Sequence, residues 1–223
     1  MNDLDFEKAR YNMVEQQVRP WDVLDPRVLE VISSIPREDF APEKYKQLAY
    51  ADIHIPLGND ENGPCMLNPN IEGRIMQHLH IGDDDVVLEI GSGTGYLTAC
   101  LSKLARHVDS VEIDPALSAQ AEKNLAAHDI TNVTISTGDG CKRWNQKQFY
   151  DAIVISGSMP AIPESYKKML KDGGRLFVVT GVAPAMTAHL VTRISKDEWT
   201  TEDLFETCIP ALIGAEHAEE FNF

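Results

Sequence analysis

From residue 86 onward, short apolar runs alternate with longer segments whose apolar residues recur at helical spacing. Short apolar runs are typical of buried strands, and spacings of three and four residues are typical of helices. The expected strands cover residues 86–90, a run that ends at Glu112, and residues 133–136, 150–155 and 174–179. The expected helices cover residues 97–104, 115–128 and 163–170. This alternation predicts an α/β fold with a doubly wound, mostly parallel sheet covered on both faces.

The two ends of the chain add different elements to this sheet. Residues 190–194 and 204–209 form two more apolar runs, which predict a closing antiparallel pair of strands. Ahead of the sheet, helical spacing covers residues 6–18 and 71–79, and a further helix begins at Asp25 and Pro26 and ends at Pro36. We therefore expect an N-terminal helical extension in front of the sheet.

Residues 52–69 interrupt these helices without any periodicity and are rich in Gly, Asn, Pro and Asp. Such a composition is typical of a loop. We interpret this segment as an ordered functional loop, because apolar side chains can anchor it to the core. The expected anchors are Ile53, Ile55, Leu57, Met66 and Leu67.

A glycine-rich turn follows the first strand of the sheet, where three glycines alternate just behind an acid. Dinucleotide-binding folds space their glycines as G-x-G-x-x-G, which brings a pyrophosphate onto a helix N-terminus. The G-x-G-x-G spacing found here resembles the first motif of the S-adenosylmethionine-dependent methyltransferases, in which bare backbone packs against the methionine and ribose portions of the cofactor. The cofactor ligands expected around this turn are Glu89, Gly91, Ser92, Gly93 and Gly95.

Two acids close to the end of the second strand have different predicted roles. Glu112 ends the strand, where related folds place an acid on the ribose hydroxyls, so we assign it to the cofactor. Asp114 precedes Pro115 and is interpreted as a helix N-cap. The length fits one domain over residues 1–223, in which residues 1–82 supply the N-terminal helices and the active-site loop and residues 83–223 form the cofactor-binding core.

The amino-acid composition limits which binding partners and which cellular compartment we expect. The formal net charge of −15 argues against nucleic acid or an anionic membrane as the main partner. The 4 cysteines form no C-x-x-C pair, so we expect neither a metal site nor a disulfide framework. No apolar run approaches the length of a membrane span, and the charged N-terminus lacks the apolar core of a signal peptide. We therefore expect a cytoplasmic protein.

Segments spread over the whole chain are similar to one methyltransferase family. They cover residues 13–18 (Met-Val-Glu-Gln-Gln-Val), 36–42 (Pro-Arg-Glu-Asp-Phe-Ala-Pro), 49–52, 55–57, 88–96, 132–133, 138–140, 150–153 and 163–181. On these segments the chain resembles the protein-L-isoaspartate O-methyltransferases. The resemblance implies a Rossmann-like methyltransferase fold, with S-adenosyl-L-methionine as methyl donor and S-adenosyl-L-homocysteine as product. It implies an isoaspartyl carboxylate of a damaged protein or peptide as the acceptor.

The same resemblance extends to the later turns of the sheet. The Gly-Asp-Gly segment after the third strand resembles the family position near the adenine, which assigns Asp139 and Gly140 to the cofactor. Ser156 ends the fourth strand, at the edge where open sheets bind their ligands, and is expected to line the same pocket.

The loop departs from the family pattern in one segment. Family members carry Gly-Gln-Thr-Ile-Ser-x-Pro against both cofactor and substrate, whereas this chain reads Gly-Pro-Cys-Met-Leu-Asn-Pro over residues 63–69. Pro69 is retained, the two hydroxyl groups are lost, and the serine falls on Leu67 or Asn68. The residues expected to act at the methyl acceptor are therefore Leu67, Asn68 and Pro69, with the Asn68 amide as the replacement hydrogen-bonding group.

Methyl transfer from a sulfonium to a carboxylate needs no titratable group of the protein to act as a general base. A carboxylate with a reference pKa of about 4 is ionised at neutral pH, so alignment and exclusion of water suffice without a general base. His54 in the loop is accordingly interpreted as solvated, and Arg10, Arg19 and Arg74 are candidates to hold the charge of the acceptor. Two alternatives stay open: methylation of another carboxylate acceptor, and a cofactor-binding interaction module without activity.

Overall fold

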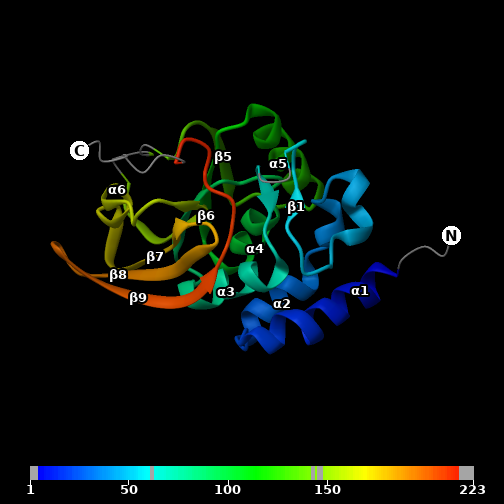
Figure 1. Ribbon diagram of the computed structural model, residues 1–223, viewed down its shortest axis with the longest axis horizontal. Coiled ribbons are helices and arrows are strands. Elements are labelled where there is room, and N and C mark those ends of the chain that lie inside the picture. Colours follow the sequence, from blue (N-terminus) through cyan, green and yellow to red (C-terminus); the bar gives the residue numbers. More distant parts are fainter. Residues whose placement is uncertain (1–4, 61–62, 142–143, 145–147, 216–223) are drawn as a thin grey trace.

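The computed structural model describes residues 5–60, 63–141, 144 and 148–215, and its centre is one sheet of seven strands (Figure 1). The strands lie in the order β5-β4-β3-β6-β7-β8-β9. They are β3 (Val86–Ile90), β4 (His107–Glu112), β5 (Val133–Thr137), β6 (Tyr150–Met159), β7 (Leu170–Val182), β8 (Ala185–Ser195) and β9 (Glu198–Thr207). All pairs from β5 across to β7 are parallel, and β8 and β9 are antiparallel. The mostly parallel sheet with a closing antiparallel pair is confirmed.

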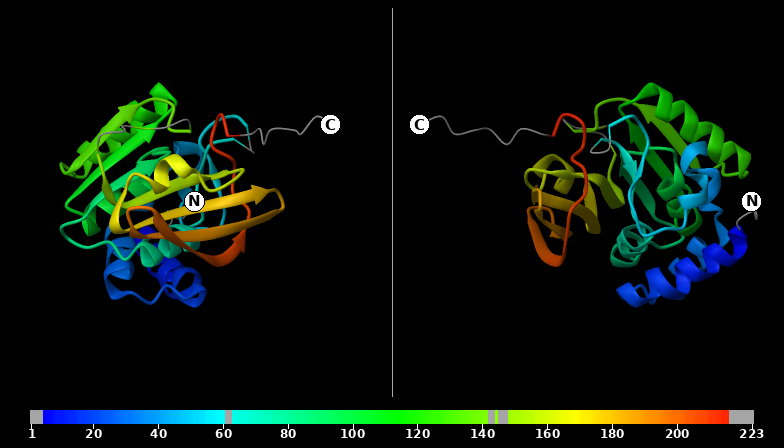
Figure 2. Two further views of the ribbon diagram at one scale, coloured as in Figure 1. Left: turned by 90° about the vertical axis from the view of Figure 1, so that its left-hand side faces the viewer. Right: turned by 45° about the vertical axis from the view of Figure 1, so that its right-hand side comes forward.

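Helices α3 (Pro69–Leu79), α4 (Tyr96–Leu104) and α5 (Pro115–Ala127) contribute to the hydrophobic core on one face of this sheet. Helix α2 (Pro26–Ser34) packs on α3 and α4, so that these two lie between the sheet and the N-terminal helices (Figures 1 and 2). Strand β3 is buried on both faces, with Val87 in the core layer of these helices and Leu88 in the opposite layer. A continuous apolar strand is what burial on both faces requires.

The helix expected over residues 163–170 is much shorter than predicted. Helix α6 spans only Glu164–Lys167, and β7 already begins at Leu170. The Met169 carbonyl accepts a hydrogen bond of 2.9 Å from the Tyr150 N–H. Because that carbonyl accepts a hydrogen bond from the sheet rather than from a following helical residue, the helix ends before it. Strand β7 therefore begins at Leu170 instead of at the predicted residue 174.

The N-terminal segments are helical, as expected. Helix α1 (Phe6–Met13) begins at Asp5, whose side chain accepts from the backbone of the first turn, and continues as a π-helical turn, Val14–Val18. The 3-10 turns Arg19–Trp21, Arg37–Asp39 and Glu43–Leu48 flank α2 or follow it. Asp25 caps α2 and Pro26 occupies its first position, which confirms the predicted start. Within the described ranges, no helix has the length and apolar character needed to cross a bilayer.

The loop over residues 52–69 contains a small antiparallel hairpin, β1 (Ile55–Pro56) with β2 (Cys65–Met66), that its sequence did not indicate. Ile55, Met66 and Leu67 are buried and anchor it as predicted. Ile53 is 42% exposed, so its predicted role as an anchor is wrong. A tight turn, closed by the Ile53 N–H on the Ala51 carbonyl, precedes β1 and leaves this side chain outside the core.

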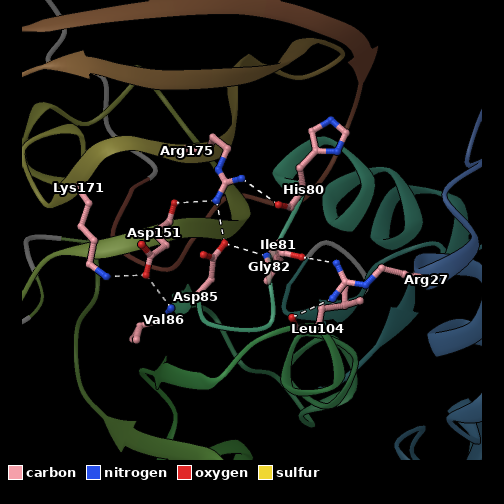
Figure 3. A network of polar contacts seen from close by, with 10 residues as sticks. All are labelled: Arg27, His80, Ile81, Gly82, Asp85, Val86, Leu104, Asp151, Lys171 and Arg175. Carbon is pink, nitrogen blue, oxygen red and sulfur yellow. Dashed lines mark hydrogen bonds and ion pairs between the residues drawn. The ribbon is translucent and has the colours of Figure 1, made fainter.

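A polar network fixes the amino-terminal end of β3 (Figure 3). Arg175 of β7 donates to Asp85 at 2.9 Å, and the Asp151 carboxylate accepts from the Val86 N–H at 2.8 Å and from Lys171 at 2.7 Å. The network also contains Arg27, His80, Ile81, Gly82 and Leu104. These bonds tie β3, β6 and β7 together at the end of the sheet where β3 begins. The loops of the candidate site follow the opposite, carboxyl-terminal ends of the strands.

Candidate functional site

Two adjoining cavities lie at the carboxyl-terminal ends of β3, β4 and β6, the edge at which open α/β sheets bind ligands. The larger comprises about 640 Å³, part of it open to solvent. Its walls are the glycine turn, the ends of β4 and β6, the turn after β5, the loop over residues 52–69 and residues 210–213. After β9 the chain returns along β6, where the Ser158 N–H donates to the Pro210 carbonyl at 2.9 Å (Figure 1). The C-terminal segment therefore closes one side of the site.

The glycine turn has backbone conformations that favour glycine. Gly91, Gly93 and Gly95 have φ values of 96°, 54° and 90°. A Cβ on Gly91 would lie 2.3 Å from Ser156 Oγ, and one on Gly93 would lie 2.9 Å from Leu57 Cδ1. Gly91 and Gly93 line both cavities, whereas Gly95 is the N-cap of α4 and lines neither. The turn thus presents bare backbone to the larger cavity.

Glu112 lies at the end of β4, beside this turn. Its carboxylate accepts from the Gly93 N–H at 2.8 Å and from the Asp114 N–H at 3.1 Å, and it lines the larger cavity. Burial raises the pKa of Glu112 above its ordinary value. Asp114 itself accepts from the Ala116 N–H at 2.7 Å as the N-cap of α5, which confirms its predicted structural role.

The predicted adenine-side residues come together on the larger cavity. Asp139 accepts from the Cys141 N–H at 2.9 Å, which shapes the turn, and Gly140 follows it along the same wall. The Tyr166 hydroxyl donates to the Gly140 carbonyl and fixes the turn from behind. Ser156 lines both cavities and donates to the Gly91 carbonyl at 2.8 Å, so it joins the end of β6 to the glycine turn.

Glu89 and Ser92 occupy different depths at the end of β3. Ser92 lines the smaller cavity, and its hydroxyl lies 2.6 Å from the Ser110 hydroxyl. Glu89 is fully buried, accepts from the Thr98 and Ser110 hydroxyls, and lines neither cavity. Burial raises the pKa of Glu89 to about 7. The structure thus places Glu89 beneath the glycine turn, where it connects α4 to β4.

Of the loop residues expected at the acceptor, Leu67 lines both cavities. Asn68 lies outside them, with its amide donating to Asp52 at 2.9 Å, and Pro69 is a buried residue in the first turn of α3. Cys65, which the sequence reasoning did not single out, lines both cavities. Burial raises the pKa of the Cys65 thiol to about 12, so the thiol stays protonated at neutral pH.

The histidine and arginines proposed from the sequence do not line these cavities. His54 is half-buried, and its Nε2 lies 3.3 Å from the Cys208 carbonyl, so its ring is partly solvated and lies outside the cavity walls. Arg19 pairs with Glu15 at 3.0 Å, and the Arg74 guanidinium lies 3.5 Å from the Phe205 ring centroid. Arg10 also lies outside the cavity walls.

A buried ion pair beside the smaller cavity was missed by the sequence reasoning. Arg37 has 0% exposure and donates to the Glu72 carboxylate and to the carbonyls of Ala49 and Leu67. Glu72, on α3, lines the smaller cavity. The only available signal was an acid among the core-facing positions of an amphipathic helix.

The fold and the site together define the class. A doubly wound sheet whose bare glycine turn is bonded to an acid at the end of the next strand is typical of nucleotide-binding α/β proteins, and the S-adenosylmethionine-dependent methyltransferases are one class of them. Within this class, the sequence profile of the protein-L-isoaspartate(D-aspartate) O-methyltransferases matches residues 8–213. The chain belongs to that family.

Relatives and solved structures agree with this assignment. Protein-L-isoaspartate O-methyltransferase 1 of Rhodopseudomonas palustris strain HaA2 is 37% identical over 212 residues, which cover 95% of this chain and 85% of that protein. The Protochlamydia amoebophila strain UWE25 enzyme is 38% identical over 207 residues, or 92% of this chain and 96% of that one. A solved protein-L-isoaspartate O-methyltransferase has a TM-score of 0.78 at 26% identity, over 92% of this chain and 65% of that chain. A Plasmodium falciparum structure in complex with S-adenosyl-L-homocysteine shares the fold, with a TM-score of 0.78 at 18% identity over 94% of this chain and 99% of that one.

Proposed function

We propose that this protein transfers a methyl group from S-adenosylmethionine to the free carboxylate of an isoaspartyl residue in a damaged protein or peptide. Family membership supports the reaction type. The observation that carries the proposal is that the loop and the glycine turn line the same two cavities. Cys65 and Leu67, from the segment that family members place against cofactor and substrate, line the same space as Gly91 and Gly93 of the glycine turn. Donor and acceptor would therefore meet where the two cavities join.

The residues around the larger cavity fit an adenosine group. Glu112 holds the middle of the turn through one bond to each carboxylate oxygen, and each oxygen can accept a second bond from a ribose hydroxyl. Asp139 and Gly140 would lie beside the adenine. The remaining walls are largely apolar, with Val111, Ile113 and Leu212 among them, as a heterocyclic ring requires.

The chain's own residues have a positioning role in this reaction. S-adenosylmethionine supplies a methyl group on a positively charged sulfur, which is open to in-line attack. An acceptor carboxylate is already ionised at neutral pH, so the site needs no general base. Leu57 and Leu67 give the junction of the cavities an apolar lining that would exclude water and hold the acceptor in line.

The proposal extends to partners and compartment. A net charge of −15 favours a protein or peptide acceptor over nucleic acid or an anionic membrane. Cys65, Cys100 and Cys208 are free thiols, as is usual in a reducing compartment, and this supports a cytoplasmic location.

Transfer of a radiolabelled methyl group from S-adenosylmethionine to an isoaspartyl peptide tests the proposed reaction. The matched control is the same peptide with a normal aspartyl residue, which should gain no label. A protein that binds S-adenosylhomocysteine but labels neither peptide would favour another carboxylate acceptor. A protein that binds no S-adenosylhomocysteine would overturn the cofactor assignment.

A further inference from the structure

Arg37 joins the two ends of the loop that forms part of the candidate site. Its Nε donates to the carbonyl of Ala49, just before the loop, at 2.8 Å, and its Nη2 donates to the carbonyl of Leu67, near the end of the loop. The remaining nitrogen, Nη1, donates to the Glu72 carboxylate on α3. Each nitrogen of one guanidinium group therefore has a partner on a different segment of the chain.

The same guanidinium group lies against the helix that follows the glycine turn. Its carbon lies 4.5 Å from the centroid of the Tyr96 ring, and Tyr96 is the first residue of α4. Leu67, Glu72 and Tyr96 all line the smaller cavity, whereas Arg37 is 0% exposed and lines neither cavity. Arg37 thus contacts three residues of the cavity wall without lining the cavity itself.

The shape of the guanidinium group fixes the relative positions of these segments. Its donors lie in one plane at fixed angles, and the group stays charged at neutral pH. The Ala49 and Leu67 carbonyls, which accept from the same group, are therefore held at a fixed spacing. A lysine could keep the ion pair with Glu72, but its single ammonium group lacks this spacing of donors.

We infer that Arg37 is a positioning residue for methyl transfer, which sets the place of Leu67 relative to the glycine turn. The inference rests on the proposed function, in which donor and acceptor meet where the loop and the turn line the same cavities. A reaction without a general base depends chiefly on alignment, and a shift of about 1 Å can cost about 100-fold in rate. The hydrogen bonds of Arg37 go to the loop and to α3, so binding of the cofactor at the turn and at Glu112 should not depend on it.

Arg37→Lys separates the ion pair from the hydrogen bonds to the loop, because it keeps a positive charge for Glu72 and loses the paired donors for the carbonyls. The kcat for an isoaspartyl peptide, counted per S-adenosylhomocysteine-binding site, should fall by about 10- to 100-fold. The dissociation constant of S-adenosylhomocysteine should stay within about threefold of the wild-type value. Counting the sites by calorimetry removes the effect of unfolded protein, so a merely structural role would leave this kcat unchanged.

Arg27→Met is the matched control, because Arg27 has the same kinds of partner at the other end of the sheet. It donates to the Ile81 carbonyl at 2.8 Å and to the Leu104 carbonyl at 3.4 Å (Figure 3), and it pairs with the Asp83 carboxylate. Arg27 lines neither cavity, so its loss should lower stability and leave kcat per site unchanged.

A double variant covers the case in which Arg37→Lys does not fold. Arg37→Met/Glu72→Leu leaves no buried charge at this position, so it should fold. It still lacks the donors for Ala49 and Leu67, so its kcat per site should show the same fall.

The outcomes separate the inference from the function on which it rests. Wild-type kcat per site in Arg37→Lys would overturn the inference alone, because the protein would still methylate the isoaspartyl peptide. A full return of kcat in the double variant would also overturn it, since that variant restores stability without the bonds to the loop. An equal fall of kcat in Arg27→Met would show that activity follows stability rather than position. Wild-type protein that labels no isoaspartyl peptide would overturn the proposed function, and the inference with it.

Discussion

Glu112 and Gly93 are joined directly, since the Glu112 carboxylate accepts a hydrogen bond of 2.8 Å from the Gly93 backbone N–H. The other oxygen of the same carboxylate accepts from the Asp114 N–H at 3.1 Å. The acid therefore fixes the middle of the glycine turn against the end of β4 and keeps further lone pairs for a ligand. Because the turn and the acid form one unit, a change in either should disturb cofactor binding.

Gly93→Ala should weaken the binding of S-adenosylhomocysteine by about tenfold or more, or about 1.4 kcal/mol. Gly93 has a φ of 54°, and an added Cβ would lie 2.9 Å from Leu57 Cδ1. The new methyl group would push the loop away from the turn at a point where both residues line the larger cavity. Isothermal titration calorimetry measures the loss.

Gly173→Ala is the control for this substitution. Gly173 also has a positive φ, 79°, but a Cβ there would meet no atom within 4 Å. Its cost should be limited to a backbone strain of about 1–2 kcal/mol in stability, with cofactor affinity unchanged. Wild-type affinity in the Gly93 variant would show that a bare turn is not needed.

Glu112→Ala should weaken the binding of S-adenosylhomocysteine by about 1–3 kcal/mol, because the ribose hydroxyls and the Gly93 N–H would lose their acceptor. Asp114→Ala is the neighbouring control. Asp114 caps α5 and lines neither cavity, so its loss should lower stability by about 1 kcal/mol and leave the dissociation constant unchanged. Equal weakening by both substitutions would contradict the ribose assignment.

The strands and helix starts could be predicted because their signals are local. Strand β3 is apolar throughout because both its faces are buried, and Asp25 and Asp114 cap helices through bonds to residues two positions ahead. The length of α6 could not be predicted. It depends on the bond from the Tyr150 N–H to the Met169 carbonyl, which joins residues far apart in the sequence.

In the candidate site, too, some features could be predicted from local sequence signals and others depend on long-range contacts. The glycine turn and Glu112 could be predicted from their spacing in the sequence. They follow or end β3 and β4, which are paired parallel strands, so the carboxyl-terminal ends of these strands lie side by side. The side of the loop that faces the cavity depends on the pairing of β2 with β1, in which Cys65 lies opposite Pro56. A shift of one residue would exchange the two sides, so the sequence could not distinguish Leu67 from Asn68. Arg37 and Glu72 are 35 residues apart and meet only in the folded chain.

Leu67→Ser should raise kcat/KM for an isoaspartyl peptide by about 2- to 10-fold, the value of one added neutral hydrogen bond. Leu67 lines both cavities, so the new hydroxyl would face the acceptor. Asn68→Ala should instead act on stability, because the Asn68 amide bonds to Asp52 outside the cavities. Steady-state kinetics and urea denaturation of both variants separate the two effects. A larger kinetic change in the Asn68 variant would place Asn68 at the acceptor.

Glu89 should make stability depend on pH. Burial raises its folded-state pKa from 4.5 to about 7, so the folded state holds the proton more tightly than the unfolded chain. Its contribution to stability is therefore complete below pH 4.5 and is lost as the pH rises to about 7. Between about pH 5.5 and pH 8, wild-type stability should fall by about 2 kcal/mol relative to Glu89→Gln, as measured by urea denaturation. Glu30→Gln, at an exposed position of α2, should leave the wild-type pH dependence intact.

Arg37→Met should lower the free energy of unfolding by about 3–5 kcal/mol, because it leaves the buried Glu72 carboxylate without its partner. Both side chains are buried, so water cannot replace the lost interaction. The double variant Arg37→Met/Glu72→Leu removes both charges and fills the space with apolar groups, so it should recover most of this loss. Guanidinium denaturation of the two single variants and the double variant gives the coupling energy. A double variant as unstable as the sum of the single variants would mean that Arg37 acts through the Ala49 and Leu67 carbonyls rather than through Glu72.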